Sequence, residues 1–429
     1  MTPLLSSLLE TSKEDVLEDS ANYWNPDKVQ SWHNDGVDLV IGKRERYFLH
    51  DMDGHRLFDL HLNGGTFNLG HRNGEIIEEI KCAMDHFDIG NHHFPAISRA
   101  ALAKALVETG PREIKYAVFS SGGGEAIDIA LKCARYGTGR KKILSIIRAY
   151  HGHTGLALGT ADGRYADQFL SAGRDDEFIK VPFNDLQAME TALANEDIAC
   201  VIMETIPATY GFPMPAEGYL KGVKALCEKY GSLYIADEVQ TGLMRCGGGH
   251  LWGISSYGVT PDILVTGKGL SGGLYPIGAV LATEQAGKWL EEDGWGHIST
   301  FGGSEIGCVA ALKVLEITTR PETIENVEMV AERMSAGLHK LMKKFDGYFT
   351  GIRQRGVIFG LEFGGDHRGA KGVMKELYKN GVWAIFSQLD QKVLQFKPGL
   401  LLTAQECDEI LERTEQGIAA AANASLTPA

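Results

Sequence analysis

Lys268 is the residue whose setting best suits covalent chemistry. It lies just beyond the apolar run DILVT and is flanked by glycines in TGKGLSGG. Glycines leave room for a ligand to approach, and a lysine amine removed from water loses its proton more readily and acts as a Schiff-base nucleophile. An exposed loop lysine is the more ordinary interpretation of this string taken alone.

Asp237 ends a second apolar run, LYIAD, 31 residues before Lys268. A buried aspartate needs a cation or a hydrogen-bond donor, because an unpaired charge is costly away from water. A protonated heterocyclic nitrogen would serve, and a cap on the following turn is the alternative. The spacing fits one strand-helix-strand step, so we expect both side chains at the same edge of a sheet.

Two further segments of the sequence contain groups that suit the binding of a flat, phosphorylated ligand. FSSGGGEAIDIALKCAR at 119–135 is typical of a strand, a turn and a helix. The amides of Gly123 and Gly124 would bind an anion there, although three glycines also suit a merely flexible turn. RAYHGHT places Tyr150 and His151 at another strand end, where an aromatic ring could stack on a ligand. No carboxylate or cysteine stands at ligand spacing nearby, so we expect no metal.

The elements that must position these residues follow an α/β pattern. Short β-branched runs alternate with amphipathic segments from about residue 116 to 268. Strands that are apolar throughout are buried on both faces, which predicts a mainly parallel sheet between layers of helices. Ligands bind at the carboxyl ends of such strands.

The pattern changes after about Gly307, where two long helical segments precede further strand-like runs. We therefore expect a large domain over residues 55–306 and a smaller α+β domain over residues 307–429. Residues 1–54 form an N-terminal arm that ends in a hairpin around Asp53 and Gly54. This arm is expected to pack with the smaller domain.

The amino-acid composition argues against several classes of protein. The 429 residues carry 42 Lys and Arg against 56 Asp and Glu, a net charge of −14, which argues against nucleic acid or an anionic membrane as a partner. No run of eighteen apolar residues and no basic leader of a secretory signal is present. The seven cysteines are scattered and include no CxxC pair, which favours a location in the reducing cytoplasm.

Together these strings resemble the class III family of pyridoxal-phosphate-dependent aminotransferases, over nearly the whole chain. The motifs that carry the resemblance are SGGGEA (121–126), YHGHT (150–154), IADEVQTG (235–242), PDILVTGKGLSGGLYPIGAV (261–280) and STFGG (299–303). The resemblance implies fold type I of these enzymes: a mainly parallel seven-stranded sheet flanked by helices, plus a smaller α+β domain from the N- and C-terminal segments. It also implies a homodimer.

The resemblance implies roles for the residues around the cofactor ring. Lys268 looks like the lysine that forms the internal aldimine with pyridoxal 5'-phosphate and later shuttles a proton, which requires a neutral amine. Asp237 is placed like the aspartate that keeps the ring nitrogen protonated. Gln240 would bond the phenolic oxygen, and Val239 and Tyr150 would cover the two ring faces.

The same resemblance extends to the phosphate and to the residues behind the ring. The backbone amides of Gly123 and Gly124 would hold the phosphate, and Thr300 matches a threonine that reaches it from the partner subunit. His151 lies beside the stacking tyrosine. Glu204, in VIMETIP, matches a glutamate that orders the site near the aspartate.

Three positions depart from the family pattern. Gly124 stands where a serine or threonine is usual, so one hydroxyl contact to the phosphate is missing and must be replaced by another donor or by water. Relatives that act on 4-aminobutyrate and ornithine carry a glutamate at the position of Thr209 and a carboxylate-binding arginine at that of Gln395. Both halves of this gate, which lets one site accept alternately a carboxylate and an apolar or amine tail, are absent here.

The absence of the gate leads to a hypothesis about the substrate. Aromatic and uncharged groups would recognise the amine, with Trp24, Tyr210 and Phe212 as walls. A keto-acid carboxylate would need another cation, such as Lys397.

The favoured activity is transfer of an amino group between an amine or amino acid and a keto acid or aldehyde, by a ping-pong mechanism. A racemase, epimerase, lyase or decarboxylase of the same family is the alternative. GKGLSG also fits the GxGxxG of a nicotinamide dehydrogenase, but a strand-like run follows where that fingerprint must open a helix. A non-catalytic binding protein is disfavoured because the lysine, the aspartate and the phosphate turn are all intact.

Overall fold

The computed structural model describes the chain apart from residues 92, 172, 175, 365–368 and 426–429. Its larger sheet has seven strands in the order β4-β10-β9-β8-β7-β5-β6, and only β10 runs antiparallel to its neighbours. The strands are β4 (Ile114–Ser120), β10 (Gly278–Thr283), β9 (Ile263–Thr266), β8 (Leu233–Asp237), β7 (Ile198–Glu204), β5 (Lys142–Ile146) and β6 (Phe178–Val181). The predicted mainly parallel seven-stranded sheet is confirmed.

Helices cover both faces of this sheet, and the strand sequences show why. Every residue of β7 is buried; Cys200 and Ile202 face one core cluster, while Val201 and Met203 face the other. Because successive side chains of a strand point to opposite faces, an unbroken apolar run demands cover on each side. One face is covered by α7 (Gly123–Thr138), and the other by α6 (Ile97–Thr109), α10 (Leu186–Leu193) and α11 (Tyr219–Tyr230).

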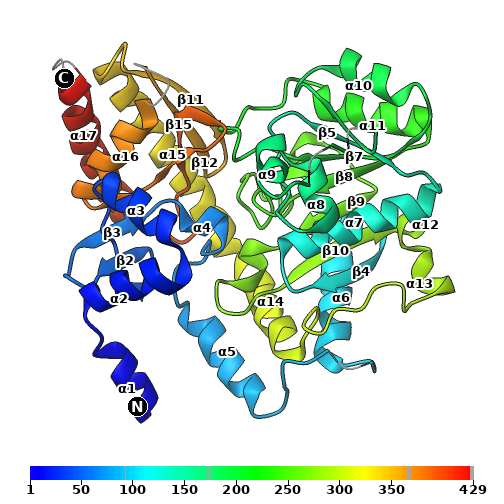
Figure 1. Cartoon of the computed structure of the whole chain (residues 1–429), viewed down its shortest axis with the longest axis horizontal. Coiled ribbons are helices and arrows are strands. Elements are labelled where there is room, and N and C mark those ends of the chain that lie inside the picture. Colours follow the sequence, from blue (N-terminus) through cyan, green and yellow to red (C-terminus); the bar gives the residue numbers. More distant parts are fainter. Residues whose placement is uncertain (92, 172, 175, 365–368, 426–429) are drawn as a thin grey trace.

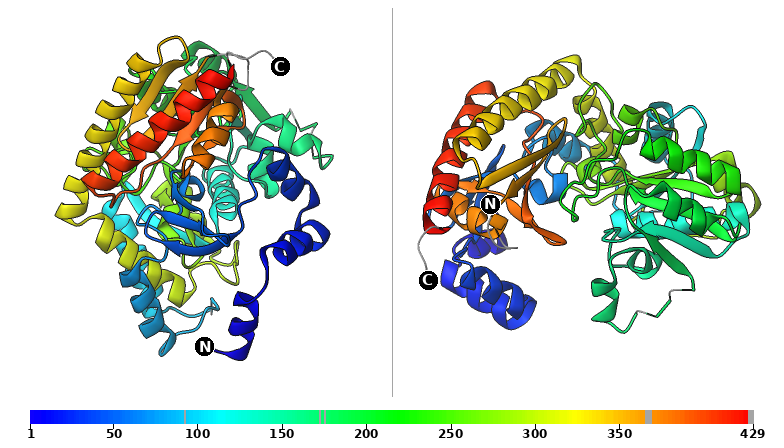
Figure 2. Two further views of the ribbon diagram at one scale, coloured as in Figure 1. Left: turned by 90° about the vertical axis from the view of Figure 1, so that its left-hand side faces the viewer. Right: turned by 90° about the horizontal axis from the view of Figure 1, so that it is seen from above.

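The N- and C-terminal segments fold together beside the large sheet (Figures 1 and 2). One four-stranded sheet has the order β1-β2-β3-β13 and the other the order β11-β12-β15-β14. The strands are β1 (Ile41–Glu45), β2 (Phe48–Asp51), β3 (Arg56–Asp59), β11 (Phe349–Arg355), β12 (Ile358–Phe363), β13 (Val382–Trp383), β14 (Ile385–Ser387) and β15 (Asp390–Phe396). β2 and β3 form the expected hairpin around Asp53 and Gly54, and β13 joins β3, so the N-terminal arm packs with C-terminal elements.

Three long helices cover these smaller sheets: α15 (Pro321–Lys344), α16 (Gly369–Lys379) and α17 (Ala404–Ser425). The remaining helical segments are α1 (Pro3–Leu9), α2 (Lys13–Asp19), η1 (Ser20–Trp24), α3 (Pro26–Asn34), α4 (Leu62–Gly65), α5 (Gly74–Met84), α8 (Gly155–Thr160), α9 (Gly163–Asp167), η2 (Gly253–Tyr257), η3 (Lys268–Ser271), α12 (Glu284–Gly287), α13 (Trp289–Glu292) and α14 (Glu305–Thr318). No helix within the described ranges is both long and apolar enough to span a membrane.

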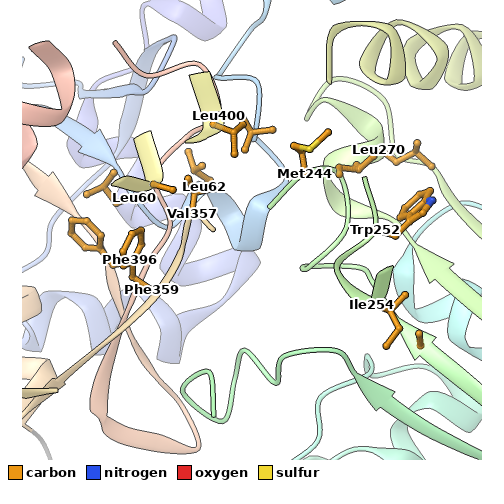
Figure 3. Close-up of a cluster of buried hydrophobic side chains, with 14 of the residues drawn as sticks. Leu60, Leu62, Met244, Trp252, Ile254, Leu270, Val357, Phe359, Phe396 and Leu400 are labelled. Atoms are coloured by element: carbon orange, nitrogen blue, oxygen red, sulfur yellow. The ribbon is translucent and has the colours of Figure 1, made fainter. Parts of the chain in front are cut away.

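One buried cluster runs between the large sheet and the smaller sheets. Figure 3 shows Leu60, Leu62 and Phe396 on one side of it and Leu270 and Trp252 on the other. Apolar packing therefore fixes the smaller sheets against the edge of the large sheet that carries Lys268. Whether the chain divides at residues 54 and 306 stays a prediction.

Candidate active site

A cavity opens at the carboxyl ends of the large-sheet strands and contains nearly all of the residues expected around a cofactor. Its lining consists of Gly123, Gly124, Tyr150, His151, Gly152, Glu204, Ile206, Asp237, Val239, Gln240, Thr241 and Lys268. The expected cofactor residues are thus gathered in one place, with the exception of Thr300. Parallel strands end at one edge of their sheet, which is why residues far apart in sequence meet here.

Lys268 follows β9 and opens η3, and its side chain lines the cavity rather than an exposed loop. Its backbone is left-handed with a φ of 38°, a strained conformation for lysine. Burial lowers the pKa of Lys268, against the opposing effect of the Asp237 and Glu204 carboxylates. A larger fraction of neutral amine, which nucleophilic attack requires, follows from that shift.

Asp237 ends β8 directly beside Glu204, which ends β7. The Asp237 carboxylate accepts hydrogen bonds from His151 Nδ1 at 2.7 Å and from the Val239 amide at 3.0 Å. These two donors fix its orientation. His151 is 3% exposed, and its Nε2 has no hydrogen-bond partner among the described residues.

Glu204 lies behind this pair and accepts hydrogen bonds from the backbone amides of Tyr150 and Ala208. Burial and the neighbouring Asp237 raise the pKa of the Glu204 carboxyl. Two adjacent buried carboxylates do not both ionise easily, so the protonated form of Glu204 is favoured.

The turn before α7 forms the floor of the cavity. Gly122 is extended, and α7 begins at Gly123, so the first amides of the helix have no intrahelical acceptor. A Cβ at residue 124 would lie 3.0 Å from the hydroxyl oxygen of Thr154. The departure at Gly124 thus has a structural counterpart, because Thr154 places a hydroxyl where a side chain at 124 would otherwise stand. YHGHT contains this threonine, but nothing in the sequence connects it to residue 124.

Several buried polar atoms around the cavity lack partners among the described residues. They include Gln240 Oε1 and His151 Nε2. Tyr150 lines the cavity and packs edge-on against His153 and Tyr165, which hold its ring in place. An aromatic wall, unpaired polar atoms and a helix N-terminus fit a flat heterocycle with a phosphate group. No group of three His, Cys, Asp or Glu side chains in the described part of the chain could hold a metal ion.

A left-handed turn that the sequence analysis missed packs against the lysine. Leu62, Asn63, Gly64 and Gly65 all have positive φ, and a Cβ at Gly64 would lie 2.8 Å from Lys268 Cε. The Asn-Gly-Gly string was the available signal for such a turn. The smaller sheets therefore supply the surface that confines the Lys268 side chain.

This contact predicts the effect of Gly64→Ala. The added methyl should displace Lys268 and lower kcat by about tenfold or more, since a misplaced catalytic group is costly. Steady-state kinetics will measure the loss. Gly139→Ala is the matched control, because Gly139 has a similar φ of 67° but open space around its Cβ position. Equal losses of activity in the two variants would show that strain alone is responsible.

Two of the predicted residues, Trp24 and Thr300, are exposed on the surface of the chain. Trp24 is 67% exposed, with the Lys28 ammonium 4.9 Å from its ring, so the structure does not bring it to Lys268 of its own chain. Thr300 is exposed, and its carbonyl accepts a hydrogen bond from the Asn91 amide.

The other predicted substrate residues lie between the cavity and the smaller sheets. Thr209 is half-buried, and its carbonyl accepts from the Leu389 amide, while Tyr210 packs beneath the Arg148 guanidinium. Phe212 is buried with the Lys397 ammonium 5.5 Å from its ring. Gln395 and Lys397 are also buried and contact each other.

The fold and the cavity together define a class: an α/β enzyme with a lysine, an aspartate and an anion-binding turn at one sheet edge. The family model of class-III aminotransferases matches residues 30–418. An uncharacterized aminotransferase of Archaeoglobus fulgidus is 44% identical over 94% of this chain and 93% of its own length. The chain belongs to the class-III aminotransferase family, whose members depend on pyridoxal phosphate.

Solved structures agree with this assignment. The acetylornithine aminotransferase of Elizabethkingia anophelis has a TM-score of 0.82 and 26% identity, covering 96% of this chain and all of its own. An ornithine aminotransferase of Toxoplasma gondii, in a structure described as having partial occupancy of pyridoxal phosphate, has a TM-score of 0.89 and 24% identity, covering 100% of this chain and 99% of its own.

Proposed function

We propose that pyridoxal phosphate is linked covalently to Lys268 in this cavity, and that the enzyme transfers an amino group from an amine or amino acid to a keto acid or aldehyde by a ping-pong mechanism. The observation that carries the proposal is the meeting of Lys268, Asp237 and the α7 turn in one cavity. The cofactor supplies an aldehyde that takes up the amino group and a ring that accepts electrons.

The residues then have distinct tasks. The neutral amine of Lys268 would hold the cofactor covalently, and its Nζ would carry a proton to and from the reacting carbon. Asp237 keeps a proton on the ring nitrogen, and His151 holds the carboxylate in position by its hydrogen bond. Glu204 orders this pair from behind. Val239 and Tyr150 would confine the ring, and the side-chain NH2 of Gln240 would donate to the phenolic oxygen.

The phosphate would be held by the Gly123 and Gly124 amides and by the Thr154 hydroxyl. Thr154→Ala should weaken the binding of pyridoxal phosphate by roughly tenfold, the usual cost of one hydrogen bond to a charged group. Thr154→Ser should retain affinity. Titration of the apoenzyme with cofactor, followed by protein fluorescence, measures both.

A double variant provides the control for this assignment. Gly124→Ser combined with Thr154→Ala moves a hydroxyl from one side of the contact to the other, and it should recover most of the affinity. An undiminished affinity in Thr154→Ala alone would exclude Thr154 from the phosphate site.

We also propose a homodimer in the cytoplasm, with Thr300 reaching the phosphate of the partner subunit. The segment around Thr300 exposes Trp295, Ile298 and Phe301, and Phe94 is exposed as well. Large apolar side chains gathered in this way favour a protein partner. All seven cysteines are free, which suits a reducing compartment. Light scattering will measure the mass in solution.

A half-reaction tests the activity. Holoenzyme is mixed with a panel of amines and amino acids without an acceptor, and the absorbance of the bound cofactor is followed. We expect the band of the aldehyde form to disappear with a true donor and to return on addition of a keto acid or aldehyde. A band that shifts and returns without net conversion, while the substrate is racemised or eliminated, would instead favour the alternative chemistry.

A further inference from the structure

A second cavity, of about 230 Å³, lies between α7 and the segment that includes α13. It shares no lining residue with the candidate active site. Figure 1 shows α13 at the right-hand edge of the molecule, far from the smaller sheets. Neither the proposed cofactor site nor the proposed reaction uses this cavity.

One wall of the cavity is a stripe of α7 residues spaced three or four apart. They are Ile129, Lys132, Cys133 and Tyr136. Residues at this spacing lie on one side of a helix. Ile129 and Cys133 are buried in the cluster between α7 and the large sheet, whereas Lys132 and Tyr136 are exposed. The stripe is therefore apolar at its base and polar at its rim.

The opposite wall consists of Trp289 on α13 and the chain that follows it. Trp289 is 8% exposed, and its indole N–H donates to Cys133 Sγ at 3.2 Å, which holds the ring against α7. Burial raises the pKa of Cys133 to about 11, so this thiol is uncharged at neutral pH. A Cβ at Gly296 would lie 3.4 Å from the Trp289 ring. Because residue 296 has no side chain, the space beside the ring stays open.

Two side chains of opposite charge line the cavity, and neither has an ionic partner in the part of the chain that the structure describes. Lys132 Nζ donates a hydrogen bond to His297 Nδ1 at 2.9 Å. Burial and the Lys132 charge lower the pKa of His297, which favours the neutral imidazole. The Asp293 carboxylate accepts a hydrogen bond from the Trp295 amide at 3.2 Å. A cation and an anion thus remain available at the rim.

An apolar cavity with a free cation and a free anion at its rim is complementary to a zwitterion with an apolar body. Its volume suits one small molecule, since a dry cavity of about 150 Å³ binds benzene and sites for drug-sized ligands start at roughly 300 Å³. Burial of the apolar body supplies most of the affinity, because exposed ion pairs are weak. The two charges orient the ligand.

We propose that this cavity binds a free α-amino acid with an apolar side chain, such as leucine. The side chain lies against Ile129 and Trp289. The carboxylate pairs with Lys132 and the ammonium pairs with Asp293. This site is separate from the cavity of Lys268, and it goes beyond the proposed function without depending on it.

Calorimetric titration of the holoenzyme with three matched ligands tests the two charges. The ligands are leucine, 4-methylpentanoate, which lacks the amino group, and 3-methylbutylamine, which lacks the carboxylate. Lys132→Met should weaken leucine binding by about three- to fivefold, as for an exposed ion pair, and leave 3-methylbutylamine unchanged. Asp293→Asn should weaken leucine binding by a similar factor and leave 4-methylpentanoate unchanged. Equal losses for all three ligands would contradict the assigned orientation.

Gly296→Leu tests the location of the site. The added side chain fills the space beside Trp289, so binding of leucine in this cavity should be abolished. Gly294→Leu is the matched control, because a Cβ at Gly294 meets only the Leu290 carbonyl oxygen, at 3.6 Å, and Gly294 does not line this cavity. It should bind leucine like the wild type. The charge variants alter exposed side chains and keep the proposal testable if Gly296→Leu fails to fold.

The absorbance of the cofactor, followed in the same titrations, reports separately on any leucine that reaches Lys268. A binding event that leaves this absorbance unchanged and disappears in Gly296→Leu supports the proposal. Unchanged affinity and stoichiometry in Gly296→Leu would overturn it, and so would a wild-type holoenzyme that binds no apolar amino acid outside the active site. Failure of amino-group transfer would refute the proposed function and leave this binding test intact.

Discussion

Replacement of Lys268 by alanine should lower kcat/KM by on the order of 10⁴-fold or more. The side chain is the only amine that lines the cavity among the described residues, and it would serve both as the covalent attachment point and as the group that moves the proton. Loss of a residue with two roles in one reaction costs more than the usual range for a single proton transfer. Steady-state kinetics and the absorbance of bound cofactor measure the two roles separately.

Lys268→Arg shows whether the neutral amine matters. A guanidinium preserves charge and length but does not give up its proton at neutral pH. We expect this variant to be as inactive as Lys268→Ala. Activity within tenfold of wild type would mean that Lys268 acts as a binding charge only. Lys288→Ala, at an exposed lysine paired with Glu292, is the control for general effects of removing a lysine.

The second large effect is expected from Asp237→Asn, which should lower kcat by roughly 10²- to 10³-fold. The amide keeps the shape of the side chain and can still accept a hydrogen bond from His151, so the cavity should stay intact. It no longer supplies the negative charge that keeps a proton on the ring nitrogen and lets the ring accept electrons. Kinetics at saturating cofactor concentration separate this loss from weakened binding.

Asp262→Asn is the matched control for Asp237→Asn. Asp262 lies just before β9, at the opposite edge of the same sheet, where it pairs with Lys224 and accepts from the Tyr234 amide. Loss of the Asp262 carboxylate should lower Tm and leave kcat unchanged. If both variants lost kcat in proportion to their stability, the carboxylate of Asp237 would have a structural role rather than an electronic one.

The amino-acid sequence by itself determined which site residues stand at the ends of strands. Lys268, Asp237 and Glu204 each follow an apolar run that ends in a turn, and parallel strands bring such ends to one edge. Whether a segment forms a strand, and whether a residue stands at the end of that strand, are local properties. They depend on the pattern of apolar residues and on nearby glycines. The predicted sheet and the gathering of these residues followed from them.

Only the tertiary structure decided which residues from separate segments touch. Thr154 lies against Gly124 because the segment before α8 meets the first turn of α7, and the Gly64 turn reaches Lys268 because the smaller sheets pack on the large one. The same packing brings the Leu60 carbonyl to the Lys397 amide, and Trp24 stays exposed. Such contacts depend on left-handed backbone angles and on burial between sheets, and many different sequences of residues satisfy those conditions equally well. Local sequence patterns therefore carry no record of these contacts.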